Sequence, residues 1–270
     1  MDEVAQFNRE RWNELVAAKI QYGQAWLDLD AAGARRWLQA HYVSGEVTGK
    51  DVLCLANGGG QQTAAFGLLG ANVTVIDMSD AQLEQDRIAA AHHGLTIRIE
   101  QGDMRDLSRF ADDSFDLVWH AYSVNFVPDA KTVLQEVARV MRPGGLYYFQ
   151  WANPFLSGVD ERDWTGEGYL LKRPYIDGAE LVFDDPDWTV GEQRVSGPRE
   201  FNHALGTVMN TLIGEGFVIR GVWEDWEGMK RDIMAEPGSW EHFLAIAPQY
   251  LIIVATYEPG VLVSSDWVVG

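Results

Sequence analysis

The chain has one cysteine, few basic residues and no long hydrophobic run. The single cysteine, Cys54, excludes an intramolecular disulfide and any metal site built from several cysteines, and it is typical of a reducing compartment. No segment approaches the roughly 18 consecutive apolar residues of a membrane span, although 47% of the 270 residues are hydrophobic. These absences predict a soluble globular protein with a sizeable core.

Basic residues number 21 against 40 acidic ones, which gives a formal net charge of -19. Such a charge repels nucleic-acid phosphates and anionic lipids, so we expect neither nucleic acid nor membrane as a partner. The acidic surface also serves solubility. The N-terminal sequence MDEVAQFNRE lacks the basic start and apolar middle of a secretion signal, so we expect a cytoplasmic protein.

Residues 50 to 150 alternate short β-branched runs with helical patterns, which is typical of βαβ units around a parallel sheet. Proline and glycine at 142–145 end one helix, and Ser79 with Gln82 forms a capping-box signature for another. The predicted strands cover 51–55, 73–76, 96–99, 115–119, 146–149, 217–219 and 250–255. The predicted helices cover 61–69, 79–94, 130–141 and 201–214.

Two regions lie outside this alternation. We predict that residues 1–45 form a helical cap in which Val4, Phe7, Trp12 and Leu15 share one face of a helix. Residues 151–200 form an insertion rich in Trp, Asp and Gly, which with the cap is a candidate lid and specificity element. With 46–150 as the core and 201–270 as the final helix and strands, we predict a single domain over 1–270.

Polar and glycine residues follow three successive strands of the predicted sheet. The turn Gly58-Gly59-Gly60 precedes a helix, so its backbone N–H groups are expected to face an anionic ligand group. Asp77 ends the second strand, where it can accept hydrogen bonds from a ribose, and Asp103 after the third can accept from an exocyclic amine. Together they predict an adenosine site at the carboxyl edge of the sheet.

This arrangement resembles the class I S-adenosylmethionine-dependent methyltransferases. Their first motif is an apolar strand with an acidic residue followed by Gly-x-Gly-x-Gly, and here it is matched by residues 52–60. Gly58 and Gly60 match the second and third glycines, but Ala56 replaces the first and Cys54 replaces the acid. What takes over from that acid is open, with Gln61 or Gln62 as candidates.

The resemblance implies an S-adenosylmethionine cofactor and an open, seven-stranded, mostly parallel Rossmann-like sheet. It also implies that the last strand is antiparallel and that helices cover both faces. We therefore expect cofactor contacts from Ala56, Asn57, Gly58, Gly60, Gln61, Gln62, Asp77, Met78, Asp103, Met104, His120 and Ala121.

The expected reaction is in-line methyl transfer to a small-molecule acceptor, with the protein a monomer or a homodimer. Because the donor methyl is already activated, positioning is the main task and a general base is optional: an amine or thiolate can lose its proton before binding, whereas an alcohol or phenol profits from a positioned base. Candidate catalytic residues are Tyr122, Asn125 and His120, although for His120 we favour a packing role, or a backbone contact with the cofactor, over acid-base chemistry. Candidate acceptor-binding residues are Trp12, Tyr22, Trp151, Asn153 and His203.

Two other functions remain open from the sequence. A nicotinamide-dependent oxidoreductase shares the glycine turn and the ribose acid, but the later glycine of Gly-x-Gly-x-x-Gly is missing. A non-catalytic adenosylmethionine-binding protein is suggested by Ala56 and Cys54. The histidines lack metal-ligand spacing, so no metal site is expected.

Overall fold

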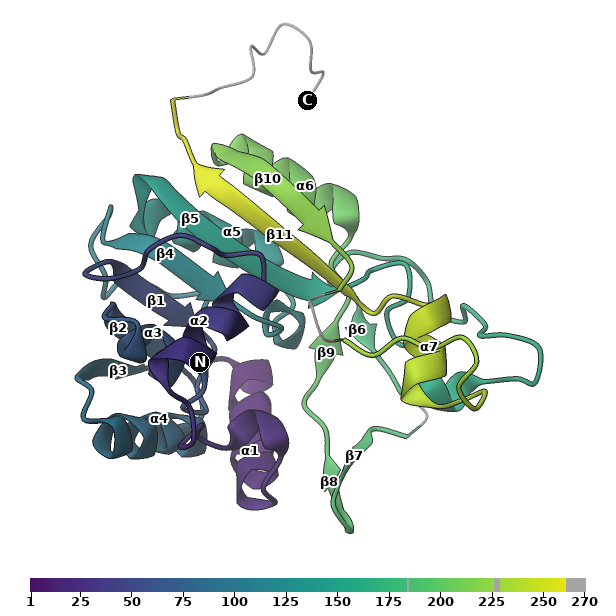
Figure 1. The fold of residues 1–270 in the computed structure, drawn as a ribbon. Helices are drawn as coiled ribbons and strands as arrows, with labels where there is room; N and C mark the ends of the chain where they lie inside the picture. Colours follow the sequence, from purple (N-terminus) through teal and green to yellow (C-terminus); the bar gives the residue numbers. More distant parts are fainter. Residues whose placement is uncertain (184, 226–228, 261–270) are drawn as a thin grey trace, which may run out of the picture.

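The computed structural model describes residues 1–183, 185–225 and 229–260. Seven strands form one sheet in the order β10-β11-β5-β4-β1-β2-β3 (Figure 1). Their bounds are β1 (Asp51–Leu55), β2 (Asn72–Asp77), β3 (Ile97–Gln101), β4 (Phe115–His120), β5 (Met141–Ala152), β10 (Phe217–Trp223) and β11 (Tyr250–Tyr257).

The first five strands run parallel to one another. β1 pairs with β2 and β4, β2 with β3, and β4 with β5, all in parallel. β11 is antiparallel to both β5 and β10. The expected seven-stranded, mostly parallel sheet with an antiparallel last strand is therefore confirmed. The chain reverses its direction of travel across the sheet between β1 and β4, and α/β sheets bind ligands beyond the carboxyl ends of strands at such a point.

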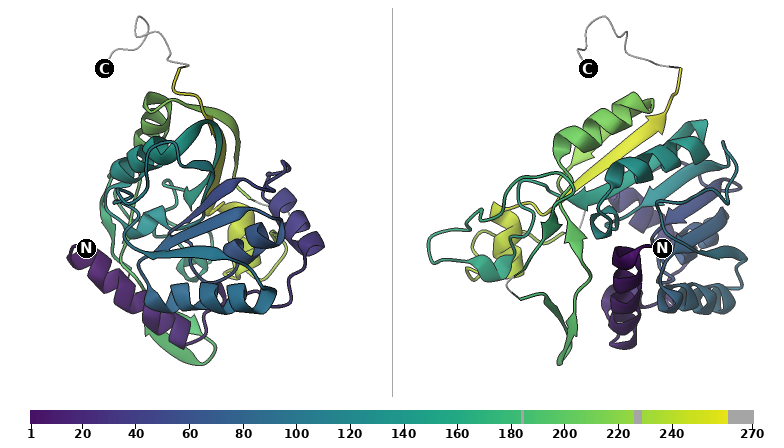
Figure 2. Two further views of the ribbon diagram at one scale, coloured as in Figure 1. Left: turned by 90° about the vertical axis from the view of Figure 1, so that its left-hand side faces the viewer. Right: turned by 180° about the vertical axis from the view of Figure 1, so that it is seen from behind.

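Helices cover both faces of the sheet (Figures 1 and 2). The helices are α1 (Glu3–Ala17), α2 (Ala31–Ala40), α3 (Gln62–Leu68), α4 (Asp80–His93), α5 (Ala130–Val140), α6 (Leu205–Gly214) and α7 (Trp240–Ile246). Apolar residues of α5 and α6 pack into the core cluster on one face, and those of α2, α3 and α4 pack into the cluster on the other. No helix of the described residues is long and apolar enough to cross a membrane.

The N-cap and the end of α4 lie where they were predicted, but the capping box is incomplete because Gln82 Oε1 has no hydrogen-bond partner. The Ser79 side chain accepts a hydrogen bond from the backbone N–H of Gln82, and Gly94 ends the helix in the left-handed conformation with φ of 66°. These caps fix where α4 starts and stops, and so place its buried face against the turn that follows β1.

The N-terminal helix α1 is present, but its buried face differs from the predicted one. The buried residues of α1 are Ala5, Asn8, Leu15 and Val16, whereas Val4, Phe7 and Trp12 are only partly covered. Asn8 explains the difference because its amide donates to the carbonyls of Phe126 and Arg199 and accepts from the Arg199 N–H. The helix is thus anchored to the insertion by a polar side chain.

The insertion and the segment after β10 contain small elements that the sequence pattern did not indicate. Strands β6 (Glu180–Leu181) and β9 (Glu200–Phe201) pair, and β7 (Asp187–Val190) pairs with β8 (Gln193–Ser196) as a hairpin. This hairpin reaches α1, and α7 lies beyond the N-terminal start of β11 (Figure 1). Short 3₁₀ turns occur at η1 (Gln21–Gly23), η2 (Val124–Phe126) and η3 (Glu161–Asp163).

Two predicted boundaries were wrong. β5 runs for 12 residues from Met141 to Ala152, through the Pro143-Gly144-Gly145 turn predicted to precede it, and its pairing with β4 shifts register there. Proline and glycine at this sheet end disturb the ladder but do not stop the strand. The helix expected from Phe201 begins only at Leu205, because Glu200 and Phe201 pair with β6. Residues 226–228 and 261–270 of the predicted final segment lie outside the described part.

Candidate functional site

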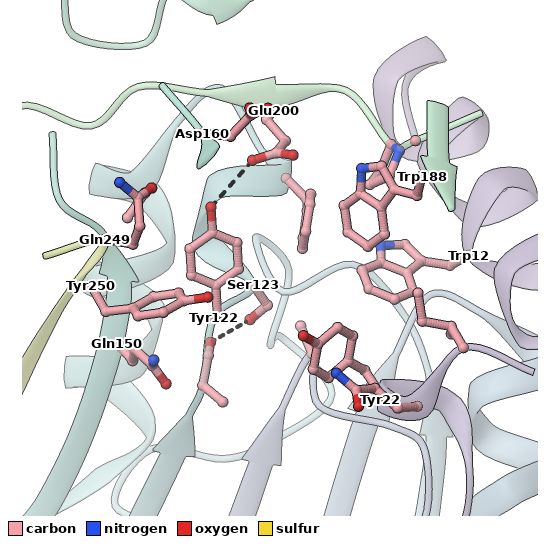
Figure 3. A pocket seen from close by; sticks show the side chains of 18 of the residues that line it. Trp12, Tyr22, Tyr122, Ser123, Gln150, Asp160, Trp188, Glu200, Gln249 and Tyr250 are labelled. Atoms are coloured by element: carbon pink, nitrogen blue, oxygen red, sulfur yellow. Dashed lines mark hydrogen bonds between the residues drawn. The ribbon is translucent and has the colours of Figure 1, made fainter. Parts of the chain in front are cut away.

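A cavity of about 1600 Å³ runs along the carboxyl edge of the sheet. One end is lined by the turn after β1 and the ends of β2 and β3. The other end is lined by residues after β4, by β5 and β11, and by the insertion. Figure 3 shows the second end, where side chains from α1, from the segment after β4, from β11 and from the insertion face one space.

The backbone N–H groups of the glycine turn are already hydrogen-bonded within the protein. Gly58 donates to Asp77 Oδ2 at 3.0 Å, and Gly59 and Gly60 donate to the Asp86 carboxylate at 3.2 and 3.0 Å. The expectation that these groups face an anionic ligand was therefore wrong. The N–H groups of the turn do donate to negatively charged groups, but these are two carboxylates of the protein and not a ligand.

Asp86 is the second carboxylate that holds the glycine turn. It lies on α4, is fully buried, and also accepts a 2.6 Å hydrogen bond from Thr63 Oγ1. Burial raises the pKa of Asp86 to about 7, and the same carboxylate, together with burial, raises the pKa of the Cys54 thiol well above its usual value. Asp86 therefore contacts the glycine turn from the facing helix, whereas Gln61 and Gln62 line the cavity.

A sequence signal for Asp86 existed. It repeats in phase with Leu83 and Ala89 on the buried face of α4, where a charged residue is rare unless it has partners. The sequence of β1 gave no indication of Asp86, because Asp86 lies on α4 and meets the turn only in the folded structure.

Asp77 ends β2 and lines the cavity, as predicted. Its carboxylate accepts from the N–H groups of Gly58 and, at 2.8 Å, of Ser79. Burial raises the pKa of Asp77, while these backbone hydrogen bonds act in the opposite direction. A carboxylate has about four acceptor positions, so two remain for hydroxyl donors from the cavity.

The neighbouring residues Met78, Gly102 and Met104 also line the cavity, whereas Asp103 does not. Both oxygens of Asp103 accept hydrogen bonds from the Arg105 guanidinium, which also pairs with Asp2. Contact between Asp103 and a ligand amine requires Arg105 to move. In this structure Asp103 holds the turn after β3.

Unpaired polar atoms at the glycine-turn end of the cavity fit a polar ligand. Asn57 Oδ1 and Gln82 Oε1 are buried without a hydrogen-bond partner, and both residues line the cavity. Buried acceptors of this kind are costly unless something donates to them. A Cβ on Gly58 would lie 2.8 Å from Gln82 Cβ, so only glycine allows this close approach. These features, with Asp77, suit a nucleoside with an amino-acid tail.

Most of the other predicted cofactor residues border the same end. Gln61 lines the cavity and also donates to the carbonyls of Gln21 and Gln24, which ties η1 over the turn. Gly60 is behind the lining, against α4. The remaining predicted residues on the lining are Ala56, Asn57, Gly58, Gln62 and Ala121.

Aromatic and polar side chains line the far end. Trp12 and Tyr22, both predicted for the acceptor, are there, and the Trp12 ring meets that of Trp188 edge-on at 5.8 Å. Tyr122, also predicted, stands beside Tyr250 with ring centroids 5.5 Å apart. Figure 3 shows these rings around one open space.

Glu200 is a site residue that the sequence analysis missed. It lies on β9, is only 8% exposed, lines the cavity and accepts a 3.2 Å hydrogen bond from the Tyr122 hydroxyl. Burial raises the pKa of Glu200 to about 7. No local pattern distinguishes it from the other acidic residues of the insertion.

Besides Gly60 and Asp103, five predicted residues do not line the cavity, because they are buried against other parts of the protein. His120 Nδ1 meets the Tyr147 hydroxyl at 2.8 Å, and burial lowers the pKa of His120 to about 3. Trp151 is fully buried and stacks on Phe149. The side chains of three others hydrogen-bond to backbone groups: Asn125 to Phe201 and Ala152, Asn153 to Pro248, and His203 to Val124. Each of these five has a structural role that accounts for its position.

Among the residues that the structure describes, no group of three or more His, Cys, Asp and Glu side chains is placed to hold a metal ion.

A family model described as a methyltransferase domain matches residues 53–149, from β1 to β5. The chain is 35% identical over 189 residues to the methyltransferase YbaJ of Bacillus subtilis, which covers 69% of this chain and 72% of that protein. It is 33% identical over 107 residues to a ubiquinone biosynthesis O-methyltransferase of Pseudomonas syringae pv. tomato, covering 40% of this chain and 46% of that protein.

Solved structures share the fold. An S-adenosylmethionine-dependent methyltransferase from Mesorhizobium loti superposes with a TM-score of 0.61 at 24% identity, over 86% of this chain and all of that one. A second, from Listeria monocytogenes, gives a TM-score of 0.60 at 20% identity, over 84% of this chain and 99% of that one.

Proposed function

The chain belongs to the class I S-adenosylmethionine-dependent methyltransferases, and on that premise we propose that it transfers the methyl group in line to a small-molecule acceptor. The observation that carries the proposal is the continuity of the cavity. One end of the cavity has the residues suited to the donor. The other end is lined by aromatic side chains and is covered by α1 and the insertion.

The donor end is assigned to the turn after β1 and the strand ends beside it. Asp77 accepts from the ribose hydroxyls, and Met78 with Met104 encloses the adenine ring beside Gly102. Asn57 and Gln82 offer their unpaired oxygens to the amino group of the methionine part. Asp86 does not contact the donor in this assignment, but it fixes the turn that does.

The acceptor end is assigned to Trp12, Tyr22, Tyr122, Trp188 and Tyr250. Their rings exclude water and restrict the orientation of a small planar or aliphatic acceptor. The bound donor supplies an activated methyl group. The protein therefore contributes mainly alignment, for which effective molarities of about 10⁵ to 10⁸ M are attainable.

The roof formed by α1 and the insertion favours a small acceptor over a macromolecule. The β7–β8 hairpin packs against α1 through Trp188 and Trp12. Negative charge, -19 in total, also repels nucleic acid. A polymer or a folded protein would have to displace the hairpin to reach the cavity.

Screening of acceptor pools with isotopically labelled methyl donor tests the function, with products identified by mass. We expect label in a compound of low molecular weight, and label found only in protein or nucleic acid would contradict the proposal. With a chiral methyl group, one in-line transfer inverts the configuration, whereas retention would indicate two successive transfers.

A further inference from the structure

Glu200 is a buried carboxylate without a cationic partner. No ion pair joins it to any Lys, Arg or His within the described ranges, and the only hydrogen bond to its side chain there comes from Tyr122. The adjacent cation, Arg199, turns the other way and holds Glu180 through two 2.7 Å hydrogen bonds. A buried charge is stable only when it is paired or neutralised.

The surroundings of Glu200 are aromatic. Tyr122 and Tyr250 stand on one side of the space below the carboxylate, and Trp12 and Trp188 stand on the other (Figure 3). Ring faces attract cations by their electron density. A carboxylate above several rings is the combination that recognises an organic ammonium group, and among the described residues no Lys or Arg forms an ion pair with Glu200.

We propose that Glu200 is the counter-ion and proton acceptor for a primary or secondary amine, which is the methyl acceptor of this enzyme. The inference rests on the proposed small-molecule methyl transfer and names the chemical class of its acceptor. The rings hold the carbon skeleton of the amine, and the carboxylate holds the nitrogen.

The protons and electron pairs balance. The ammonium group gives one proton to the Glu200 carboxylate, which frees the nitrogen lone pair. That pair forms the new N–CH₃ bond as the S–CH₃ bond of the donor breaks, and the sulfur keeps the bonding electrons. The methylated amine leaves as an ammonium ion, and the carboxylic acid returns its proton to water.

Glu200 has the properties this exchange needs. Its pKa, raised by burial to about 7, lets the carboxyl group gain and lose a proton near neutral pH. Tyr122 donates a hydrogen bond to Glu200 and Tyr250 lies nearby with Glu161 beyond, while Asp160, Arg162 and Lys230 are charged side chains that also line the cavity. A neutral hydroxyl acceptor would leave the buried carboxylate uncompensated in the bound complex.

The test is binding of matched probes to the full chain saturated with S-adenosylhomocysteine. One set contains benzylamine, phenethylamine and cyclohexylmethylamine, and the other contains the three corresponding alcohols. Affinities are measured by ligand-observed NMR at pH 8, where both the amines and Glu200 are charged. The variants are Glu200→Gln and, as the matched control, Glu180→Gln, whose carboxylate on the paired strand is already held by Arg199.

We expect at least one amine to bind tenfold or more tightly than its alcohol. Glu200→Gln should weaken that amine at least tenfold and leave the alcohols unchanged, whereas Glu180→Gln should stay within twofold of the parent. The affinity of each variant for S-adenosylhomocysteine, measured by calorimetry, shows that the fold and donor end are intact.

Binding of alcohols as strongly as amines, or equal amine affinity in Glu200→Gln, overturns the inference and leaves the small-molecule function standing. Failure of every probe in both sets overturns the inference and also counts against the proposed function. If S-adenosylhomocysteine still binds when every probe fails, the assignment of the donor end stands and only the assignment of the acceptor end is lost.

Discussion

The Asp86 carboxylate on α4 accepts a 3.0 Å hydrogen bond from the backbone N–H of Gly60 in the turn after β1. This contact joins two segments that are 26 residues apart in the sequence. Cys54, on β1, is fully buried beside it and is kept neutral by burial and by the Asp86 charge. The shape of the donor turn therefore depends on a helix residue.

Asp86→Asn should weaken donor binding at least tenfold. The amide keeps one acceptor oxygen but presents an NH₂ group to the turn, where it repels a backbone N–H that Asp86 had accepted from, at a cost of about 1 to 3 kcal/mol; the Gly59 N–H keeps the Gln82 carbonyl as a second acceptor, at 3.1 Å. Calorimetric titration with S-adenosylmethionine measures the change. Asp80→Asn, on the exposed side of the same helix, is the control and should have donor affinity close to that of the parent.

Asp77→Asn should weaken donor binding by about 1.5 to 3 kcal/mol, because it replaces a charged acceptor of the ribose hydroxyls with an amide. Asp116→Asn is the matched control, since Asp116 lies at the opposite edge of the sheet and pairs with Arg142. Titration with S-adenosylhomocysteine gives both affinities. Equal affinity of Asp77→Asn and the parent would remove Asp77 from the donor site.

The contribution of Glu200 to the free energy of unfolding should decrease as the pH rises from about 4.5 to 7. Its pKa rises from 4.5 to about 7 on folding, so the folded state binds more protons in this window and loses that advantage as pH increases. Buried His120 contributes with the opposite sign, because its pKa falls to about 3. The quantity to measure is therefore the difference between Glu200→Gln and the parent.

Urea unfolding at pH 5 and pH 8 gives that difference. The quantity compared is the free energy of unfolding of Glu200→Gln minus that of the parent. This difference should be about 2 to 3 kcal/mol more positive at pH 8 than at pH 5, since one pKa unit corresponds to about 1.4 kcal/mol. Glu180→Gln should show no such change across this range, because Arg199 lowers the pKa of Glu180. A difference that is independent of pH in Glu200→Gln would contradict the raised pKa.

Trp188→Ala should raise the KM for the acceptor at least tenfold with little change in donor affinity. The ring contacts Trp12 across the roof, and such an edge-on pair is worth about 0.5 to 1.5 kcal/mol beyond its buried area. Phe155→Ala is the control, because Phe155 is an exposed ring of the same insertion that does not line the cavity. Steady-state kinetics with the acceptor from the labelled screen separates the two variants, and an equal KM in both would contradict the assignment.

The alternation of strands and helices over residues 50 to 150 and the turn at Gly58 were readable from the sequence because they depend on local rules. Hydrophobic periodicity, caps and glycine conformations act over a few residues. The position of Asp77 at the cavity followed as well, since parallel strands end at the same edge of a sheet. The boundaries of β5 and α6 did not follow, because strand pairing overrode the local signals of Pro143 and Phe201.

The sequence by itself determined the order of the elements and the presence of an adenosine-type site, since both are encoded in short periodic patterns and in the residues just after strands. Only the tertiary structure decided that Asp86 closes the glycine turn, that Glu200 enters the acceptor chamber, and that His120 and Trp151 belong to the core. Burial and hydrogen bonding between distant segments set those roles, and no local pattern in a single chain specifies which distant groups will meet.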